Sequence, residues 1–115
     1  MVKPKDGIYV NHILSAINLI EGFTANATFE EFCDNPMMHS AVTRQLEIIG
    51  EAAKRLSIEL KTELHLLPWR KITGTRDVLI HDYIDVDLEI IWKAATEDVQ
   101  TLRQALKHLQ TPTLF

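Results

Sequence analysis

The chain has 115 residues, of which 46% are hydrophobic and 24% are charged. This length suits one domain with a real core, and four glycines and four prolines argue against a loop-rich or disordered chain. No apolar run approaches the roughly 18 residues that a membrane-spanning helix needs. The net charge of −4 counts against a broad electrostatic nucleic-acid binder, although twelve lysines and arginines can still form a local basic cleft.

The N-terminal segment and the single cysteine indicate a cytoplasmic protein. The first apolar stretch is interrupted by polar residues such as Asn11 and His12 and lacks a small-residue cleavage site, so we do not expect a signal peptide. Cys33 has no partner for an internal disulfide, which suits a reducing compartment, and we expect it to be a small buried hydrophobic side chain.

The N-terminal half predicts two long helices joined by a short helical turn. Apolar residues at three- and four-residue spacing predict the first helix over residues 8–22. Thr28 and Glu31 form a capping-box pattern that opens a single turn. Asn35 and Pro36 are suited to the N-cap and first position of the second long helix. The apolar seam expected along that helix consists of Val42, Leu46, Ile49, Ala53 and Leu56.

The C-terminal half predicts two further helices. The spacing of apolar residues at 57–67 is less regular. Pro68 marks a break in the chain, and a third helix is expected from Trp69 to about Ile80. Asp85 or Asp87 can cap the last helix. Its expected buried stripe consists of Leu88, Ile91, Trp92, Ala95, Val99, Leu102, Leu106 and Leu109. The fold class is therefore all-α, an up-and-down bundle of four to five helices over residues 1–110, followed by a C-terminal tail at residues 111–115.

The segment between the last two predicted helices carries residues suited to phosphodiester chemistry. Arg76 can orient and neutralise a phosphate, and His81 can take or give a proton near neutral pH. Tyr83 can stack on a base or donate a hydrogen bond to a phosphate oxygen. RNA supplies its own nucleophile, the 2′-hydroxyl, so no metal is strictly needed. In a continuous helix Arg76 and His81 would diverge by about 140°, which favours a helix that ends near His81 or a site completed by a second subunit.

The sequence Arg76-Asp-Val-Leu-Ile-His81-Asp-Tyr83 resembles the R-x4-H-x-Y motif of the HepT-like toxins of the HEPN superfamily. The stretch Ile49-Gly-Glu-Ala52, the run Pro68-Trp-Arg-Lys71 and the opening Val86-Asp-Leu88 of the last helix are also similar. The resemblance covers nearly the whole chain in length and helix order. It implies a HEPN-type bundle that acts as a metal-independent ribonuclease toxin on RNA, as some relatives act on tRNA.

The resemblance also implies roles for individual residues. Arg76 and His81 take the catalytic roles, and Asp77 holds the site. The family forms homodimers whose two motifs share a cleft, where two copies of Arg70 and Lys71 would bind RNA. The family's partner is a minimal nucleotidyltransferase antitoxin that adds AMP to the motif tyrosine, here Tyr83, and the anionic adduct would repel RNA phosphates. No cofactor is implied.

Other interpretations of these residues remain open. Arg76 could be a surface residue paired with a nearby aspartate, and His81 could interact with a helix dipole. The chain could be a catalytically silent HEPN module that binds a nucleotidyltransferase partner or a nucleotide. The dipeptide His81-Asp82 also occurs in metal-dependent HD phosphohydrolases, but the further ligand candidates form no convincing pattern. Those candidates are His39, His65 and Asp98.

The homodimer has one feature of the sequence in its support. Gly50 and Ala52 are small residues on the second long helix, where a neighbouring backbone could approach closely.

Overall fold

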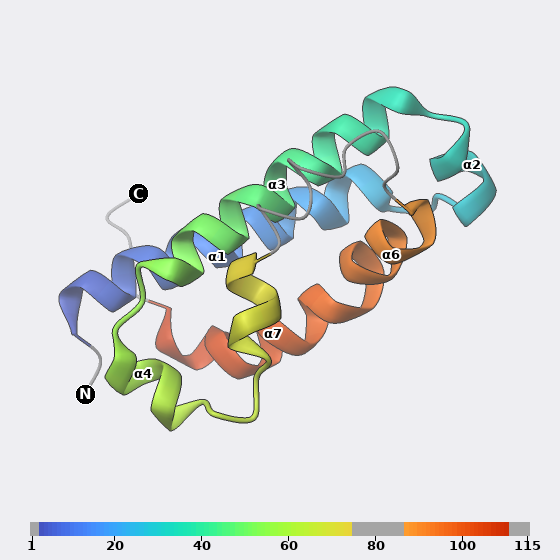
Figure 1. The fold of residues 1–115 in the computed structure, drawn as a ribbon. Helices are drawn as coiled ribbons and strands as arrows, with labels where there is room; N and C mark the ends of the chain where they lie inside the picture. The colour runs from blue at the N-terminus through green and yellow to red at the C-terminus, as the bar shows by residue number, and fades with distance from the viewer. Residues whose placement is uncertain (1–2, 75–86, 111–115) are drawn as a thin grey trace, which may run out of the picture.

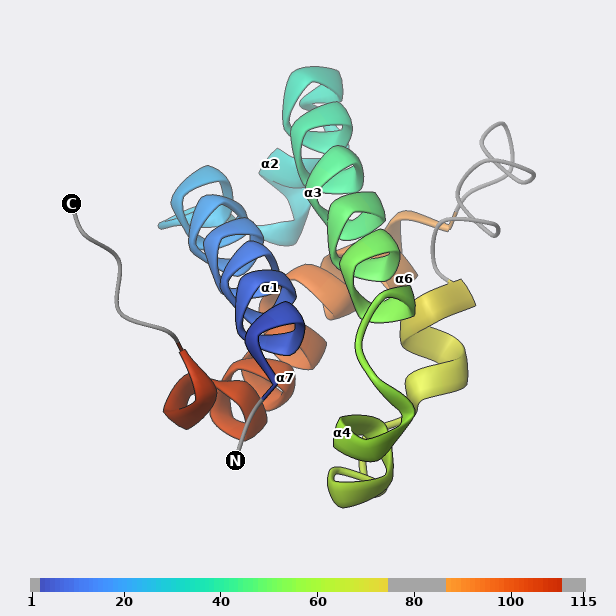
Figure 2. The same cartoon turned by 90° about the vertical axis from the view of Figure 1, so that its left-hand side faces the viewer.

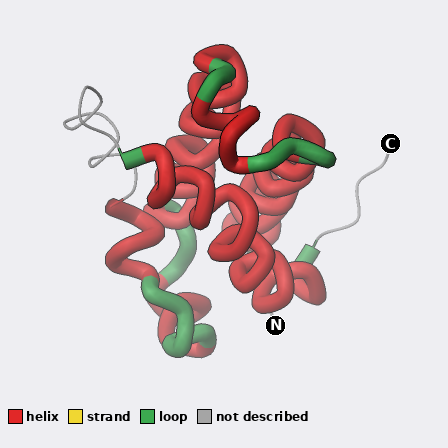
Figure 3. Tube along the Cα trace, turned by 90° about the vertical axis from the view of Figure 1, so that its right-hand side faces the viewer, coloured by secondary structure: helices red, strands yellow, loops and turns green. Residues whose placement is uncertain are grey.

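The computed structural model describes residues 3–74 and 87–110. Every regular element within them is a helix, as the sequence predicts (Figures 1 and 3). In chain order the elements are α1 (Pro4–Thr24), α2 (Phe29–Cys33), α3 (Pro36–Lys54), α4 (Ile58–Glu63), a helical stretch at 69–74, α6 (Leu88–Lys93), the π-helical segment η2 (Ala94–Asp98), α7 (Val99–Leu106) and the 3₁₀ turn η3 (Lys107–Leu109).

The long helices pack side by side. α1 and α3 lie against each other and run in opposite directions, and the run from α6 to α7 crosses beneath them (Figures 1 and 2). Helix α1 contributes the largest share of the core, because its apolar residues at three- and four-residue spacing face both neighbours. These fully or nearly fully buried residues are Val10, Ile13, Leu14, Ile17 and Ile20.

Helix α1 is longer than the expected helix over residues 8–22. Pro4 occupies its first turn, where a missing N–H costs nothing, so the helix begins ahead of the apolar stripe. At the other end, the hydroxyl of Thr24 donates a hydrogen bond to the carbonyl of Ile20 at 2.9 Å. The apolar pattern alone marked only the part of the helix that contacts the core.

The predicted caps of α2 and α3 are confirmed. The side chain of Thr28 accepts a hydrogen bond from the amide of Glu31 at 3.1 Å, and that of Asn35 accepts one from the amide of Met38 at 3.1 Å. Pro36 stands at the start of α3. The seam expected along α3 is buried throughout, at Val42, Leu46, Ile49, Ala53 and the following Leu56.

Helix α4 was not predicted, because the spacing of its apolar residues is irregular. Ser57 starts it by accepting a hydrogen bond from the amide of Leu60 at 3.2 Å. Leu60 is the residue of this short helix that is buried. A helix of one and a half turns needs only a cap and one buried side chain, which leaves too little periodicity to detect.

The last predicted helix forms with an interruption. Asp87 caps α6, and a π-helical segment at Ala94–Asp98 separates α6 from α7. The predicted stripe faces the core along the whole run: Ile91, Ala95, Val99, Leu102 and Leu106 are buried, and Leu88, Trp92 and Leu109 are half-buried against them. Polar contacts tie this run to α1, with Arg103 donating a hydrogen bond to Asn18 at 2.8 Å and Gln100 donating one to Glu21 at 3.1 Å.

The small residues of α3 serve packing within one chain. Gly50 and Ala52 are both buried in the single chain. The homodimer stays a prediction. Cys33, expected to be buried, is half-buried. None of the helices within the described ranges is long and apolar enough to cross a membrane.

Candidate functional site

The four motif residues of the predicted catalytic site, Arg76, Asp77, His81 and Tyr83, lie outside the described residues, as does the predicted C-terminal tail. The structure does place the chain on both sides of the motif. The described part stops at Gly74 and resumes at Asp87.

The chain leading into the motif is fixed to the body of the protein. The indole N–H of Trp69 lies within hydrogen-bond distance of the carbonyls of Lys61, at 3.1 Å, and Leu64, at 3.0 Å. Ile72, one turn later, packs against the core. The hydroxyl of Thr73 donates to the carbonyl of Trp69 at 2.9 Å. These contacts hold the helical stretch at 69–74 in one orientation up to the residue before the motif segment.

The chain leaving the motif is fixed in a similar way. Asp87 accepts a hydrogen bond from the amide of Glu89 at 2.8 Å and so starts α6. Trp92 then packs on Phe32, with ring centroids 5.1 Å apart, and on Phe29 at 6.2 Å. Because both flanks are anchored, the motif segment is tied to the body at each end.

Arg70 and Lys71, the predicted RNA-binding residues, are exposed on the helical stretch at 69–74. Lys71 also lines a mostly apolar cavity of about 260 Å³, together with Leu46 of α3 and Lys93 of α6. Both basic side chains lie within six positions of Arg76 in the sequence.

A polar groove between α1 and α3 was missed by the sequence analysis. It has a volume of about 370 Å³ and is open to solvent. Ile48 and Ala52 contribute to its floor. Its polar lining consists of Tyr9 and His12 from α1, Arg44, Glu47 and Glu51 from α3, and Arg55 at the C-cap of α3; we call it the α1–α3 groove.

The contacts in the α1–α3 groove join its side chains in two groups. Arg44 lies 3.4 Å from Glu47, and Arg55 lies 3.7 Å from Glu51. The guanidinium of Arg55 also lies over the ring of Tyr9, 5.9 Å from its centroid. The rings of Tyr9 and His12 meet edge to face at 5.6 Å. The result is an aromatic pair beside two arginine–glutamate pairs, with the arginines at the two ends of the row and the glutamates between them.

A signal for this groove was present in the sequence. Residues 44, 48, 51 and 55 follow each other at three- and four-residue spacing, and residue 47 lies three positions from 44 and four from 51, so all five share one face of α3 and its C-cap. A polar helix face is usually solvated, so this spacing alone did not distinguish a groove from ordinary surface. Only the packing of α1 brings Tyr9 and His12 beside it.

The ligand candidates for a metal-dependent site are placed apart from one another. Among residues 3–74 and 87–110, no group of three or more His, Cys, Asp or Glu side chains is arranged to hold a metal ion. The ring of His39 contacts the carbonyl of Phe32, and Asp98 lies 3.7 Å from Lys93. Neither residue is thus part of such a group.

Comparison with known proteins places the chain in a family. Residues 13–109 match the family described as "Ribonuclease HepT-like". "Probable ribonuclease HepT" from Thermococcus cleftensis is 40% identical over 102 residues, which cover 89% of this chain and 93% of that protein. "Putative RNase TTE0752" from Caldanaerobacter subterraneus subsp. tengcongensis is 36% identical over 88% of this chain and 90% of its own length.

A third relative is a longer protein. "Gamma-glutamylcyclotransferase and putative RNase MJ0434" from Methanocaldococcus jannaschii is 38% identical over 86% of this chain, and the match covers 45% of its length. The chain thus spans less than half of this relative. No solved structure matches the chain with significant similarity. The family match covers most of the chain, and these relatives are 36–40% identical to it: the chain belongs to the HepT-like ribonuclease family.

Proposed function

We propose that the protein is a metal-independent ribonuclease that acts as the toxin of a HEPN and nucleotidyltransferase toxin–antitoxin pair in the cytoplasm. The observation that carries this proposal is the family match over residues 13–109, combined with an intact Arg76, Asp77, His81 and Tyr83 in the sequence. The anchored flanks of the motif segment support it, because catalysis needs its groups held on a fixed scaffold.

The proposed reaction uses the 2′-hydroxyl of RNA as the nucleophile. Its oxygen forms a bond to the adjacent phosphorus while the bond from phosphorus to the 5′ oxygen breaks. His81 takes part in the proton transfers, which remove the proton of the 2′-hydroxyl and supply one to the leaving 5′ oxygen. Arg76 binds the phosphate and stabilises the charge that builds up on its oxygens. Asp77 holds these groups in place.

The basic residues ahead of the motif supply the proposed RNA contact. Arg70 and Lys71 are exposed on the helix that leads to Arg76, which supports a role in holding the RNA backbone. In a homodimer, two copies of this surface would give local positive charge in a chain whose net charge is −4. Tyr83 is the proposed acceptor of AMP from a minimal nucleotidyltransferase antitoxin.

The test is RNA cleavage by the purified, unmodified protein in EDTA, with Arg76→Ala and His81→Ala variants that remain folded. His108→Ala, on the exposed turn η3, is the matched control for loss of a histidine. We expect the wild type and His108→Ala to cut RNA and the two motif variants to be inactive. Activity that requires a divalent metal would instead support an HD-type hydrolase. An inactive wild type that still binds a nucleotidyltransferase would indicate a partner-binding module.

A further inference from the structure

The α1–α3 groove combines two aromatic rings with two arginines and two glutamates. We propose that it binds a nucleotide of the RNA substrate, with a base against Tyr9 and His12 and the backbone phosphates along Arg44 and Arg55. This inference rests on the proposed function for its substrate class. It adds a binding surface on helices that the motif does not include.

The size of the groove favours a nucleotide. Its volume of about 370 Å³ is near the lower end of the range for small-molecule sites, roughly 300–1,000 Å³. It is open to solvent, as a site that binds part of a longer strand must be. Single-stranded RNA exposes base faces and edges that an RNA duplex keeps paired and stacked.

The aromatic end of the groove suits a base. Tyr9 is half-buried and packs against the core, so its ring is held in place. His12 is exposed and meets this ring edge to face. Proteins bind single-stranded nucleic acid by stacking bases on such side chains, and an arginine beside the ring adds a cation–π contribution. Arg55 is in this position, 5.9 Å from the centroid of the Tyr9 ring.

The charged side chains of the groove suit the phosphates of an RNA backbone. The side chains of Arg44 and Arg55 are 68% and 56% exposed, and their contacts with Glu47 and Glu51 are long, at 3.4 and 3.7 Å. Long contacts of exposed arginines contribute little, so a phosphate that binds an arginine in a bidentate manner can replace the half-buried carboxylate.

The spacing of the two arginines favours a strand over a free nucleotide. Arg44 and Arg55 are eleven positions apart along α3 and its C-cap, which corresponds to about 16 Å along the helix axis. One phosphate cannot contact both positions. A strand lying along α3 can place phosphates that are about two or three nucleotides apart near the two arginines, with a base turned toward α1 between them.

The experiment measures binding without cleavage. The full-length protein is titrated against a fluorescently labelled, short single-stranded 2′-O-methyl RNA, which lacks the nucleophilic hydroxyl. We expect His12→Ala and Arg55→Ala to weaken binding about five- to hundredfold, the range for loss of one stacking contact. Arg44→Ala should also lower the salt dependence, reducing the slope of log K against log salt by about 0.7. Lys107→Ala, which removes one positive charge from η3 outside the groove, should change the affinity little.

The conservative variants separate a binding role from a structural one. Arg44→Lys and Arg55→Lys should keep most of the salt dependence, and urea denaturation should show each variant as stable as the wild type. Unchanged RNA binding in folded Arg44→Ala and Arg55→Ala variants would overturn the inference. So would AMP binding as tightly as the RNA with the same dependence on both arginines, because that result would identify a free-nucleotide site.

Failure of the proposed function gives a different result. If the protein binds 2′-O-methyl RNA through the groove but cuts no RNA, the inference about the groove stands and the proposed ribonuclease function is wrong. If the protein cuts RNA but its groove variants bind RNA as the wild type does, the proposed ribonuclease function stands and the inference about the groove is wrong.

Discussion

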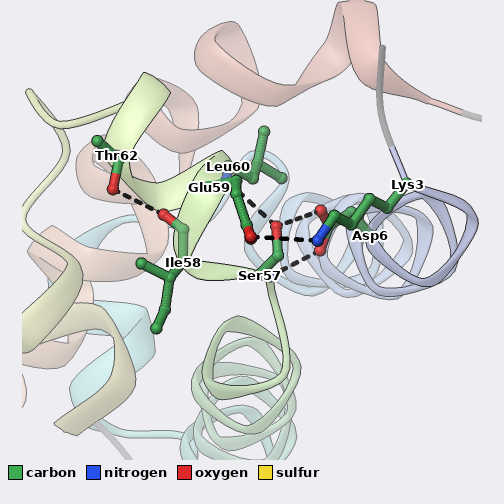
Figure 4. Close-up of polar contacts among 7 residues, drawn as sticks. All are labelled: Lys3, Asp6, Ser57, Ile58, Glu59, Leu60 and Thr62. Atoms are coloured by element: carbon green, nitrogen blue, oxygen red, sulfur yellow. Dashed lines mark hydrogen bonds and ion pairs between the residues drawn. The ribbon is translucent and has the colours of Figure 1, made fainter.

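The carboxylate of Asp6 accepts two hydrogen bonds from Ser57, a residue 51 positions later in the chain (Figure 4). The amide of Ser57 donates to one oxygen at 2.7 Å, and its hydroxyl donates to the other at 2.6 Å. Asp6 is only 2% exposed. The pair joins the first turn of α1 to the start of α4, where the same hydroxyl also caps the helix by accepting from the amide of Leu60.

We predict that Asp6→Ala lowers the free energy of unfolding by about 2–4 kcal/mol, because it leaves the amide and hydroxyl of a half-buried Ser57 without their acceptor. Urea denaturation followed by circular dichroism measures the change. Glu59→Gln is the matched control: Glu59 lies in the same region and contacts Lys3 at 3.2 Å, but both side chains are exposed. The pKa of Glu59 is lowered, chiefly by a hydrogen bond to its own backbone amide and next by the hydrogen bond to Lys3. We expect little change in this control, and equal losses in the two variants would contradict the prediction.

The aromatic cluster around Phe32 gives a second prediction. Phe32 is fully buried, with its ring 5.1 Å from that of Trp92 and 4.8 Å from that of His39. We expect Phe32→Ala to destabilise the fold by about 3–5 kcal/mol through lost burial and a cavity. Trp92 emission should shift to the red in the native state as water reaches its ring.

Phe32→Leu keeps most of the apolar volume and should cost clearly less than the alanine variant. Thermal denaturation of the two variants separates the effect of lost side-chain volume from the effect of losing the aromatic ring at position 32. A Phe32→Ala protein as stable as the wild type would show that α2 does not hold α6 in place.

A third prediction concerns Arg70 and Lys71. Both are exposed ahead of the motif, so charge loss at either residue should not disturb the core. If they contact phosphates, Arg70→Ala and Lys71→Ala should each raise KM for RNA and reduce the salt slope by about 0.7, with kcat nearly unchanged. Steady-state cleavage at several salt concentrations gives both quantities. A drop in kcat at constant KM would instead indicate that these residues act in the chemical step.

A fourth prediction separates the two proposed roles of Tyr83. Tyr83→Phe removes the hydroxyl that would receive AMP but retains a ring that can stack on a base. We expect the variant to cut RNA and to resist inactivation by a cognate nucleotidyltransferase with ATP. Intact-protein mass spectrometry should show one added AMP on the wild type and none on the variant. AMP addition to Tyr83→Phe would move the modification to another residue.

Much of the fold was predictable because local chemistry specifies it. The caps at Thr28, Asn35 and Asp87 satisfy amides in their own first turns, and the apolar stripes need only the 3.6-residue period. The family was also readable from sequence, since the motif from Arg76 to Tyr83 lies within one short segment. Features of this kind depend on residues close together in the chain.

The contacts that only the tertiary structure decided join residues far apart in the chain. From the sequence alone, Asp6 is an ordinary acidic residue in the first turn of a helix. Tyr9 and His12 are residues at the edge of an apolar stripe. Packing of α1 on α3 buries Asp6 against Ser57 and places the two rings beside Arg55. Gly50 and Ala52 are also buried within one chain. Sequence periodicity specifies which face of a helix is apolar, but the partner of that face is determined by the free energy of packing all the helices together.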